Sequence, residues 1–177
     1  MNGNAKSKLL PFSLTALILL LDQGVKFYIV RNWPLQGSLI KDVFNNDLLY
    51  IFHVRNKAIA FSLGDTLPEN LRPLLFIVVP ILVLGFLVWF YFTSQDFSQS
   101  QRWAFAGIIG GGLGNIIDRI FRPDGVVDFI SVRIFGIFGM ERWPTFNIAD
   151  SSVVICCFLF LISILRNSKK PENTAET

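Results

Sequence analysis

Two aspartates set among apolar residues are the strongest candidates for chemistry in this sequence. Asp128 lies in the stretch VVDFI, and Asp150 lies near the start of FNIADSSVVICCFLFLISIL. Two carboxyl groups that lie close together in a site of low polarity cannot both ionise easily, so they share a proton. One of them can then take a proton from water while the other protonates a leaving amine. The pair suggests peptide hydrolysis, and a proton-coupled transporter is the alternative use of such carboxylates.

The other reactive residue types offer few routes to catalysis. His53 is the only histidine and stands in a strand-like run, which favours a surface or core role over a catalytic triad. Cys156 and Cys157 are adjacent and match no metal-ligand spacing, so we expect them to pack, and we expect no metal and no cofactor. The net charge of +3 comes from scattered basic residues. That pattern is typical of membrane proteins beside anionic lipid rather than of nucleic-acid binding.

The composition is that of an integral membrane protein. Hydrophobic residues make up 52% of the chain and charged residues 16%, whereas charged residues are about a quarter of a soluble protein. A bilayer core requires about 20 apolar residues per helix. We predict an all-α membrane fold, a bundle of four transmembrane helices in one domain over residues 1–166, followed by a disordered cytoplasmic tail over 167–177. The predicted spans are residues 9–30, 73–93 (with a kink at Pro80), 103–121 and 146–165.

Four spans place both ends of the chain on one side of the membrane. Basic residues at both ends favour the cytoplasm for that side, although the loops on the other side are also basic. The terminal basic residues are Lys6, Lys8, Arg166, Lys169 and Lys170. On the other side, the run LLYIFHVRN after the turn NND, and the run VVDFISV after the turn RPDG, predict a small extracytoplasmic β-sheet with amphipathic segments at the interface.

This topology gathers the intramembrane polar residues into one layer. The first and third spans end, and the fourth begins, on the same side of the membrane. Charges in lipid cost several kcal/mol, so such residues are expected to face inward and to be functional. Asp150 is expected about 6 Å below the start of its helix, at a rise of about 1.5 Å per residue. The residues of this layer are Asp22, Lys26, Asn115, Asp118, Arg119, Asn147 and Asp150, with Asn56 and Asp128 in loops on that side.

Helical spacing predicts which of these residues meet. Asp22 and Lys26 are four apart and can pair, as a structural ion pair or as part of a site. Asn115 and Arg119 share a helix face and offer either an interhelical contact or a site. Asp118 is the weakest candidate, because Arg119 and the nearby interface are expected to solvate it. The run GGGLG over residues 110–114 predicts close approach of another helix.

Five blocks in order give the sequence a resemblance to lipoprotein signal peptidase, also called signal peptidase II. They are DQGVK (22–26), RNKAIAFS (55–62), GGGLGNIIDR (110–119), VVDF (126–129) and FNIADSS (146–152). The resemblance implies a bacterial aspartic endopeptidase with four transmembrane helices and cytoplasmic termini. It implies cleavage of prolipoproteins before a diacylglyceryl-modified cysteine, at the outer face of the cytoplasmic membrane, without a metal or cofactor. The implied catalytic residues are Asp128 and Asp150, and the implied supporting residues are Asp22, Lys26, Asn56, Asn115, Arg119 and Asn147.

One block departs from the family pattern, and three rival functions make different predictions. The family pattern N-x-G-A-A-F has Ala58 and Ile59 at its small pair here, which is expected to strain or reshape that loop. A presenilin-type protease requires an aspartate in G-x-G-D, where this chain has Asn115. A proton-linked carrier needs polar groups along a path through the membrane, which the second span and the cytoplasmic halves of the others lack. A non-enzymatic scaffold predicts that replacing the two aspartates changes little.

Overall fold

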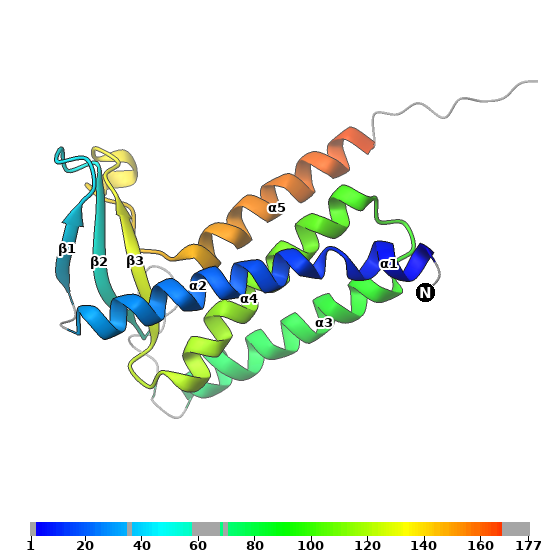
Figure 1. Ribbon diagram of the computed structural model, residues 1–177, viewed down its shortest axis with the longest axis horizontal. Coiled ribbons are helices and arrows are strands. Elements are labelled where there is room, and N and C mark those ends of the chain that lie inside the picture. Colours follow the sequence, from blue (N-terminus) through cyan, green and yellow to red (C-terminus); the bar gives the residue numbers. More distant parts are fainter. Residues whose placement is uncertain (1–2, 35–36, 58–67, 69–70, 168–177) are drawn as a thin grey trace, which may run out of the picture.

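The computed structural model describes residues 3–34, 37–57, 68 and 71–167. Within these residues, four helical segments are long and apolar enough to cross a membrane, namely Lys6–Asn32, Leu74–Thr93, Gln99–Phe121 and Ile148–Arg166. They pack side by side, and a three-stranded sheet stands at one end of the bundle (Figure 1). The predicted fold class, a four-helix membrane bundle with a small sheet, is confirmed. Of the predicted tail over 167–177, Asn167 is the last residue of the fourth span's helix, and residues 168–177 lie outside the described residues, as does the block at Ala58 and Ile59.

The spans begin and end where prolines and caps dictate. The first consists of α1 (Gly3–Leu9) and α2 (Phe12–Asn32), which are separated at Pro11 because proline has no N–H to continue a helix. In the second, a π-helical turn, η3 (Leu74–Val78), precedes α3 (Val79–Thr93). Pro80, where a kink was predicted, lies in the first turn of α3. The π-helical turn therefore ends two residues before it.

The last two spans differ from the prediction at their starts. The third, α4 (Gln99–Phe121), begins four residues before the predicted position because Ser98 and Gln101 form a capping box there. The fourth, α5 (Ile148–Asn167), begins later than predicted, because Phe146 forms a β-bridge with Ile130 instead of a helical turn. Asp150 therefore lies only about 3 Å into its helix, at a rise of about 1.5 Å per residue. The predicted depth of about 6 Å was wrong for this reason.

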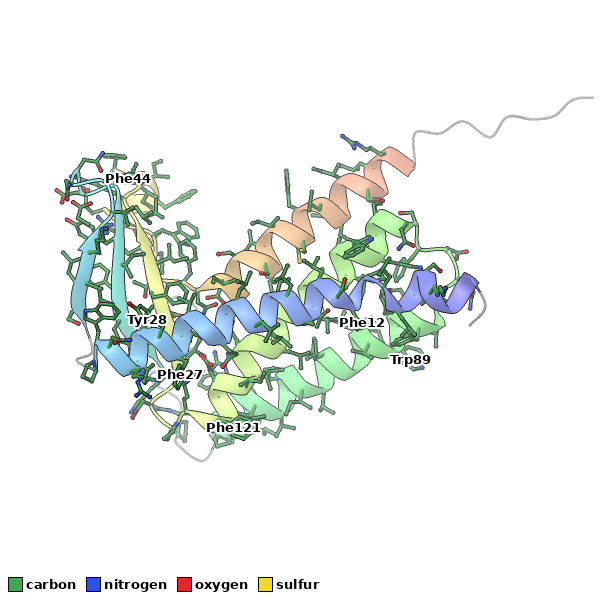
Figure 2. The ribbon with its side chains drawn as sticks, in the orientation of Figure 1. Phe12, Phe27, Tyr28, Phe44, Trp89 and Phe121 are labelled. Atoms are coloured by element: carbon green, nitrogen blue, oxygen red, sulfur yellow. The ribbon has the colours of Figure 1, made fainter. Side chains whose placement is uncertain are left out.

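Apolar side chains cover the outside of the bundle, as expected where lipid is the solvent. Phe27, Trp89 and Phe121 are 62%, 59% and 75% exposed and point away from the helices (Figure 2). The central helix α4 is the most buried of the four spans and packs against α2 and α5. Because lipid tails are as apolar as these side chains, close packing and polar contacts, rather than the hydrophobic effect, hold the helices together.

The glycine run of α4 brings its neighbours into backbone contact, as its sequence predicted. A methyl group added at Gly110 would lie 3.1 Å from the Thr15 Cα of α2. A methyl group at Gly111 would lie 2.4 Å from the carbonyl oxygen of Ala149 in α5. The two glycines therefore face opposite neighbours and set the spacing of three helices.

We expect Gly111→Ala to destabilise the protein by about 1–3 kcal/mol, the usual cost of overpacking a tight core. The added methyl group meets a main-chain oxygen of Ala149, which cannot turn away as a side chain can. Thermal or denaturant unfolding in detergent measures the effect. Gly85→Ala in α3 is the matched control, because nothing lies within 4 Å of its added methyl group. Equal stability of the two variants would contradict the close approach of α4 and α5.

The sheet is antiparallel, with the order β1 (Ser38–Asp42), β2 (Leu49–Asn56) and β3 (Val126–Val132). Its core consists of Val127 and Phe129 packed on Ile29 of α2, so the sheet rests on the end of the first span. His53 is buried, and its Nδ1 lies 2.5 Å from the Trp33 carbonyl oxygen, so of the surface and core roles expected it has the core role. The sheet thereby positions Asn56 and Asp128 above the ends of the helices.

Candidate active site

The start of α5 is capped by the two polar residues that the sequence placed there. Asn147 Oδ1 accepts a hydrogen bond from the Asp150 backbone N–H (2.9 Å), and Asp150 Oδ2 accepts one from the Asn147 backbone N–H (3.1 Å). This reciprocal pair satisfies donors that a helix start leaves open, and it is the Asn/Asp counterpart of a capping box. Asp150 is thereby fixed in position by the same contacts that begin the helix.

Asp128 is held on β3 by two side-chain amides. Its Oδ1 accepts a hydrogen bond from Asn147 Nδ2 at 2.7 Å, and its Oδ2 accepts one from Asn56 Nδ2 at 2.9 Å. Asn56 reaches it from the neighbouring strand β2, whose end pairs with Val126. Asn147 therefore contacts both aspartates, Asp150 through its backbone and Asp128 through its side chain.

The environment of Asp128 changes its acidity. Burial raises the pKa of Asp128 to about 7, the negative charge of Asp150 acts in the same direction, and the hydrogen bonds from Asn56 and Asn147 oppose them. Only 2% of the Asp128 residue surface is exposed. A carboxyl with this pKa is present in both its protonated and its ionised form at neutral pH, which suits a group that exchanges protons during a reaction.

A buried ion network of Asp22, Lys26 and Asp118 lies next to the residues that hold Asp128 and Asp150. Lys26 Nζ lies 2.8 Å from Asp22 Oδ2 and 3.0 Å from Asp118 Oδ2, and none of the three side chains is exposed. Lys26 also donates to Asn115 Oδ1 at 3.1 Å. The Asp22–Lys26 pair predicted from their spacing is confirmed.

The lysine fixes the orientation of the amide beside it. Asn115 Oδ1 accepts hydrogen bonds from Lys26 and from Asn147 Nδ2 (3.1 Å), so its Nδ2 must face the other way. That Nδ2 donates to Asp150 Oδ1 at 2.6 Å. Both oxygens of Asp150 therefore have donors, one from α4 and one from its own helix start.

Asp22 and Asp118 tie the network to the surrounding backbone. Asp22 Oδ1 accepts a hydrogen bond from the Ala149 N–H (3.0 Å), which joins α2 to the start of α5. Asp118 Oδ2 accepts one from the Val127 N–H (3.0 Å), which joins α4 to β3. The two elements that carry Asp150 and Asp128, α5 and β3, are thus each joined to another helix by a buried carboxylate.

Asp118 is the residue on which the sequence interpretation was wrong. Instead of being solvated beside Arg119, it is fully buried between Lys26 and Arg122 and forms ion pairs with both. Gln23 also donates to Asp118 (2.9 Å) and accepts a hydrogen bond from Arg122 (3.0 Å). Spacing offered a signal, because Asp118 lies four residues before Arg122, so the two can pair on one face of α4. Gln23 was also missed, and nothing in its local sequence distinguishes it.

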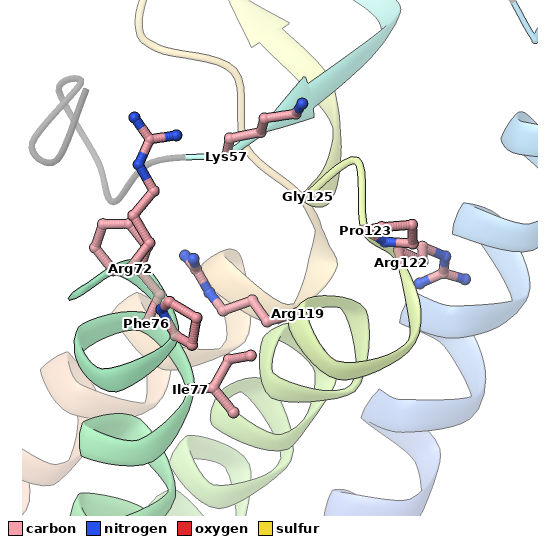
Figure 3. Close-up of a pocket in the computed structure, with 9 residues that line it drawn as sticks. Lys57, Arg72, Phe76, Ile77, Arg119, Arg122, Pro123 and Gly125 are labelled. Carbon is pink, nitrogen blue, oxygen red and sulfur yellow. The ribbon is translucent and has the colours of Figure 1, made fainter. Parts of the chain in front are cut away.

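Arg119 lies at the edge of the site, in the wall of a cavity of about 270 Å³. Its guanidinium stands 5.3 Å from the ring centre of Phe76 in η3. The charges of Asp128, Asp150 and Asp118 all act on it, so it lies within their electrostatic reach. Of the eight site residues predicted from the sequence, seven are joined by hydrogen bonds and ion pairs. Arg119 is the one that lines the cavity (Figure 3).

The comparisons with known proteins identify the family. The model of the family described as signal peptidase (SPase) II matches residues 14–166. The chain belongs to the signal peptidase II family. It is 43% identical to the lipoprotein signal peptidase of Treponema pallidum over 93% of this chain and 88% of that protein. It is 40% identical to the lipoprotein signal peptidase of Borrelia duttonii over 98% of this chain and 99% of that protein.

A solved structure supports the same conclusion on the fold. A bacterial membrane enzyme determined by the in meso method at 2.3 Å resolution superposes with a TM-score of 0.75 at 29% identity, covering 94% of each chain. Membership of the signal peptidase II family makes the chain a multi-pass membrane peptidase, which is a hydrolase. The predicted family is therefore confirmed, and the carrier and scaffold alternatives are not supported.

Proposed function

We propose that the chain is an aspartic endopeptidase in which Asp128 and Asp150 together activate water. The observation that carries this proposal is the double contact of Asn147, which donates to Asp150 from its backbone and to Asp128 from its side chain. A single residue thus holds two carboxyl groups from different elements beside each other. Two neighbouring carboxyl groups in a buried site share one proton, which is the state that peptide hydrolysis requires.

The reaction begins with a water molecule between the two carboxyl groups. The ionised carboxylate takes a proton from the water as the water oxygen bonds to the scissile carbonyl carbon. The carbonyl π electrons move to the carbonyl oxygen, which accepts a hydrogen bond from the protonated carboxyl. The protonated carboxyl then gives its proton to the leaving nitrogen, and the negative oxygen re-forms the C=O bond as the C–N bond breaks. The products are an amine and a carboxylic acid, and the proton taken from water remains on the other carboxyl group.

The surrounding polar residues act as positioning groups in this proposal. Asn56 and Asn147 orient Asp128, while Asn115 orients Asp150. Asp22 and Lys26 keep Asn115 and the start of α5 in place. Arg119 lies within reach of the charge that develops on the pair. The pair itself needs no metal or other cofactor.

The proposed substrate is a prolipoprotein whose cysteine carries a diacylglyceryl group, with cleavage just before that cysteine. The matched proteins of Treponema pallidum and Borrelia duttonii bear the name lipoprotein signal peptidase. Asp150 lies within the first turn of a membrane span, and Asp128 lies in the strand beside it. Acyl chains held in the bilayer bring the adjacent peptide bond to this same depth, so lipid and scissile bond fit the site together.

The proposed orientation has both termini in the cytoplasm and the aspartates near the extracytoplasmic face of a bacterial cytoplasmic membrane. The start of the first span and the end of the fourth lie at the end of the bundle opposite the sheet (Figure 1). Lys6, Lys8 and Arg166 lie at that end, and basic residues beside the ends of spans favour the cytoplasm, although the loops at the sheet end are also basic.

We expect a precursor that carries the diacylglyceryl group to be cleaved at least about a hundredfold more efficiently than the same precursor without it, because acyl chains concentrate the peptide in the membrane. The test compares kcat/KM for the matched pair with purified protein in lipid nanodiscs. A precursor whose modified cysteine is replaced by serine controls for peptide sequence. Equal cleavage of lipidated and unlipidated precursors would rule out the proposed substrate while leaving the aspartic mechanism intact.

A further inference from the structure

Exposed apolar side chains gather at one end of the sheet, outside the four spans. After β3 the chain turns at η4 (Ile137–Gly139) and returns beside the strand, where Arg142 forms a β-bridge with Arg133. The turn between β1 and β2 lies against this hairpin, because Arg142 donates to the Asp47 carbonyl oxygen at 2.7 Å. The two turns together form an apolar tip, which consists of Phe44 (58% exposed), Phe135 (68%), Ile137 (56%) and Phe138 (80%).

The direction of β3 places the apolar tip at the depth where the hydrocarbon core ends. The strands run across the direction of the spans, so β3 lies along the membrane surface (Figure 1), and Phe44 marks the tip in Figure 2. Phe146, just before α5, pairs with Ile130 of β3. Phe135 lies five residues beyond Ile130, or roughly 17 Å at about 3.3 Å per residue. The tip therefore extends sideways over the lipid around the bundle rather than away from the membrane.

Lipid is the partner that fits an apolar surface in this position. A group of large exposed apolar side chains marks a binding face, and aromatic side chains are enriched where head groups meet acyl chains. The apolar tip itself carries no charge. Beside it, Arg133 pairs with Glu141 at 2.6 Å, and Arg142 donates to the main-chain oxygens of Asp47 and Ser131. The attraction that the tip offers is therefore apolar rather than electrostatic.

The backbone of the hairpin holds two phenylalanines in a conformation that favours glycine. Phe135 and Phe138 have φ values of 53° and 56°, and they alternate with Gly136 and Gly139, whose φ values are also positive. A residue with a Cβ costs free energy in this region, and glycine would remove that cost. Both phenylalanines are mostly exposed, so burial inside the protein does not account for aromatic residues there. Burial among lipids does account for them.

We propose that the apolar tip inserts among the lipids at the membrane surface and holds the sheet at a fixed depth. Its partner is the boundary between the head groups and the acyl chains of the bilayer. Because Asp128 and Asn56 lie on the same sheet, the inserted tip also fixes their height relative to the bilayer. The inference rests on the fold and on the spans, not on the proposed function. It adds a contact with the membrane beyond the four spans.

The test is electron paramagnetic resonance of full-length protein in phosphatidylcholine nanodiscs, with a spin label on Ile137→Cys. The chain's two cysteines are first removed by Cys156→Ala and Cys157→Ala. A label on Val154→Cys in the fourth span reports lipid, and a label on Asp96→Cys in the loop before α4 reports water; both residues are exposed.

We expect dissolved oxygen to relax the label at position 137 as it relaxes the label in lipid. A water-soluble nickel complex should relax it at least about fivefold less than the label at position 96, because interfacial segments lie about 5–10 Å into the bilayer. Equal relaxation of these two labels by the nickel complex would overturn the proposal.

A pair of glycine substitutions separates the role of the tip in lipid from its role in the fold. Phe135→Gly with Phe138→Gly removes both rings and suits the positive φ, which offsets the entropy that glycine adds to the unfolded chain. The midpoint of unfolding in detergent should therefore stay the same. In nanodiscs the label at position 137 should become as accessible to the nickel complex as the label at position 96. A label that stayed in lipid would overturn the proposal.

The matched control for the glycine pair is Asn45→Gly. It also places glycine at an exposed residue with positive φ (53°), but it removes no apolar ring. The label at position 137 should stay in lipid in this variant. Loss of lipid contact in the control as well would trace the effect to glycine in the turns and would overturn the role of the rings.

Two further arms identify the partner of the tip. Phosphatidylglycerol in place of phosphatidylcholine should leave the accessibility of the label unchanged, and insertion in the anionic lipid alone would overturn an apolar contact. Dipolar broadening between labels would assign the tip to contact between two copies of the chain and would overturn the lipid assignment. All measurements are repeated in Asp128→Asn protein, where the same accessibility is expected even if cleavage fails, so this inference and the proposed function can fail separately.

Discussion

Asp128→Asn and Asp150→Asn are each expected to lower the rate of precursor cleavage by at least about a thousandfold, which lies within the range of general acid–base catalysis. An amide in place of either carboxyl group cannot accept or release the proton on which the reaction depends. Single-turnover assays in detergent with a lipidated precursor measure the loss. Because the two aspartates act as one unit, the double variant should be no slower than the slower single variant.

The control for these substitutions is Asp124→Asn, which removes an exposed carboxylate from the turn just before β3. It should cleave the precursor at the unmodified rate. Unfolding curves for all variants separate loss of chemistry from loss of fold. They are needed because the NH₂ group of an Asn at position 128 or 150 can face Asn56 or Asn115, whose amide groups donate hydrogen bonds to the native carboxylates. Substantial turnover by either single variant would refute the aspartic mechanism. The chain would then be a peptidase whose catalytic residues are other than these two aspartates.

Lys26→Met is expected to have the largest effect on stability, about 3–5 kcal/mol, the usual cost of removing one partner of a buried ion network. Methionine fills a similar volume but leaves Asp22 and Asp118 buried without their shared cation. Chemical unfolding in detergent measures the change. A partial recovery is expected when Asp118→Asn is added, because one uncompensated charge is then removed.

The control is Lys41→Met on strand β1, where the lysine is exposed, and its effect should stay within about 0.5 kcal/mol. Cleavage by Lys26→Met protein should also fall, because Asn115 loses the contact that turns its Nδ2 toward Asp150. Identical unfolding curves for Lys26→Met and Lys41→Met would show that the network contributes nothing to stability.

The sequence predicted the parts of the fold that depend on local spacing. Long apolar runs gave the four spans, and the four-residue interval between Asp22 and Lys26 gave their ion pair. The glycine run gave the close approach of α4 to its neighbours. Each of these follows from helix periodicity or from the thickness of a bilayer, so no knowledge of distant contacts was required.

The features that the sequence did not predict depend on distant partners. Strand β1 has five residues, too few for a clear strand pattern in the sequence. It is a strand because it pairs with β2. The start of α5 moved because Phe146 pairs with Ile130 on β3, a partner 16 residues away. Asp118 became buried because Lys26 of another helix meets it. The types of the site residues were predictable from the sequence. The orientations of the Asn56, Asn115 and Asn147 amides were not, because these residues come from β2, α4 and the start of α5, which meet only in the fold.

The main-chain bridge between Phe146 and Ile130 has a mechanical consequence. Three backbone hydrogen bonds of 2.8–3.0 Å join Phe146, just before α5, to Phe129 and Ile130 of β3. Helices in a bilayer tilt when its thickness changes. Because backbone hydrogen bonds join β3 to the residue that precedes the N-terminus of α5, the strand and the helix start are expected to move together. The two acids should thus keep their separation in thin and thick membranes alike.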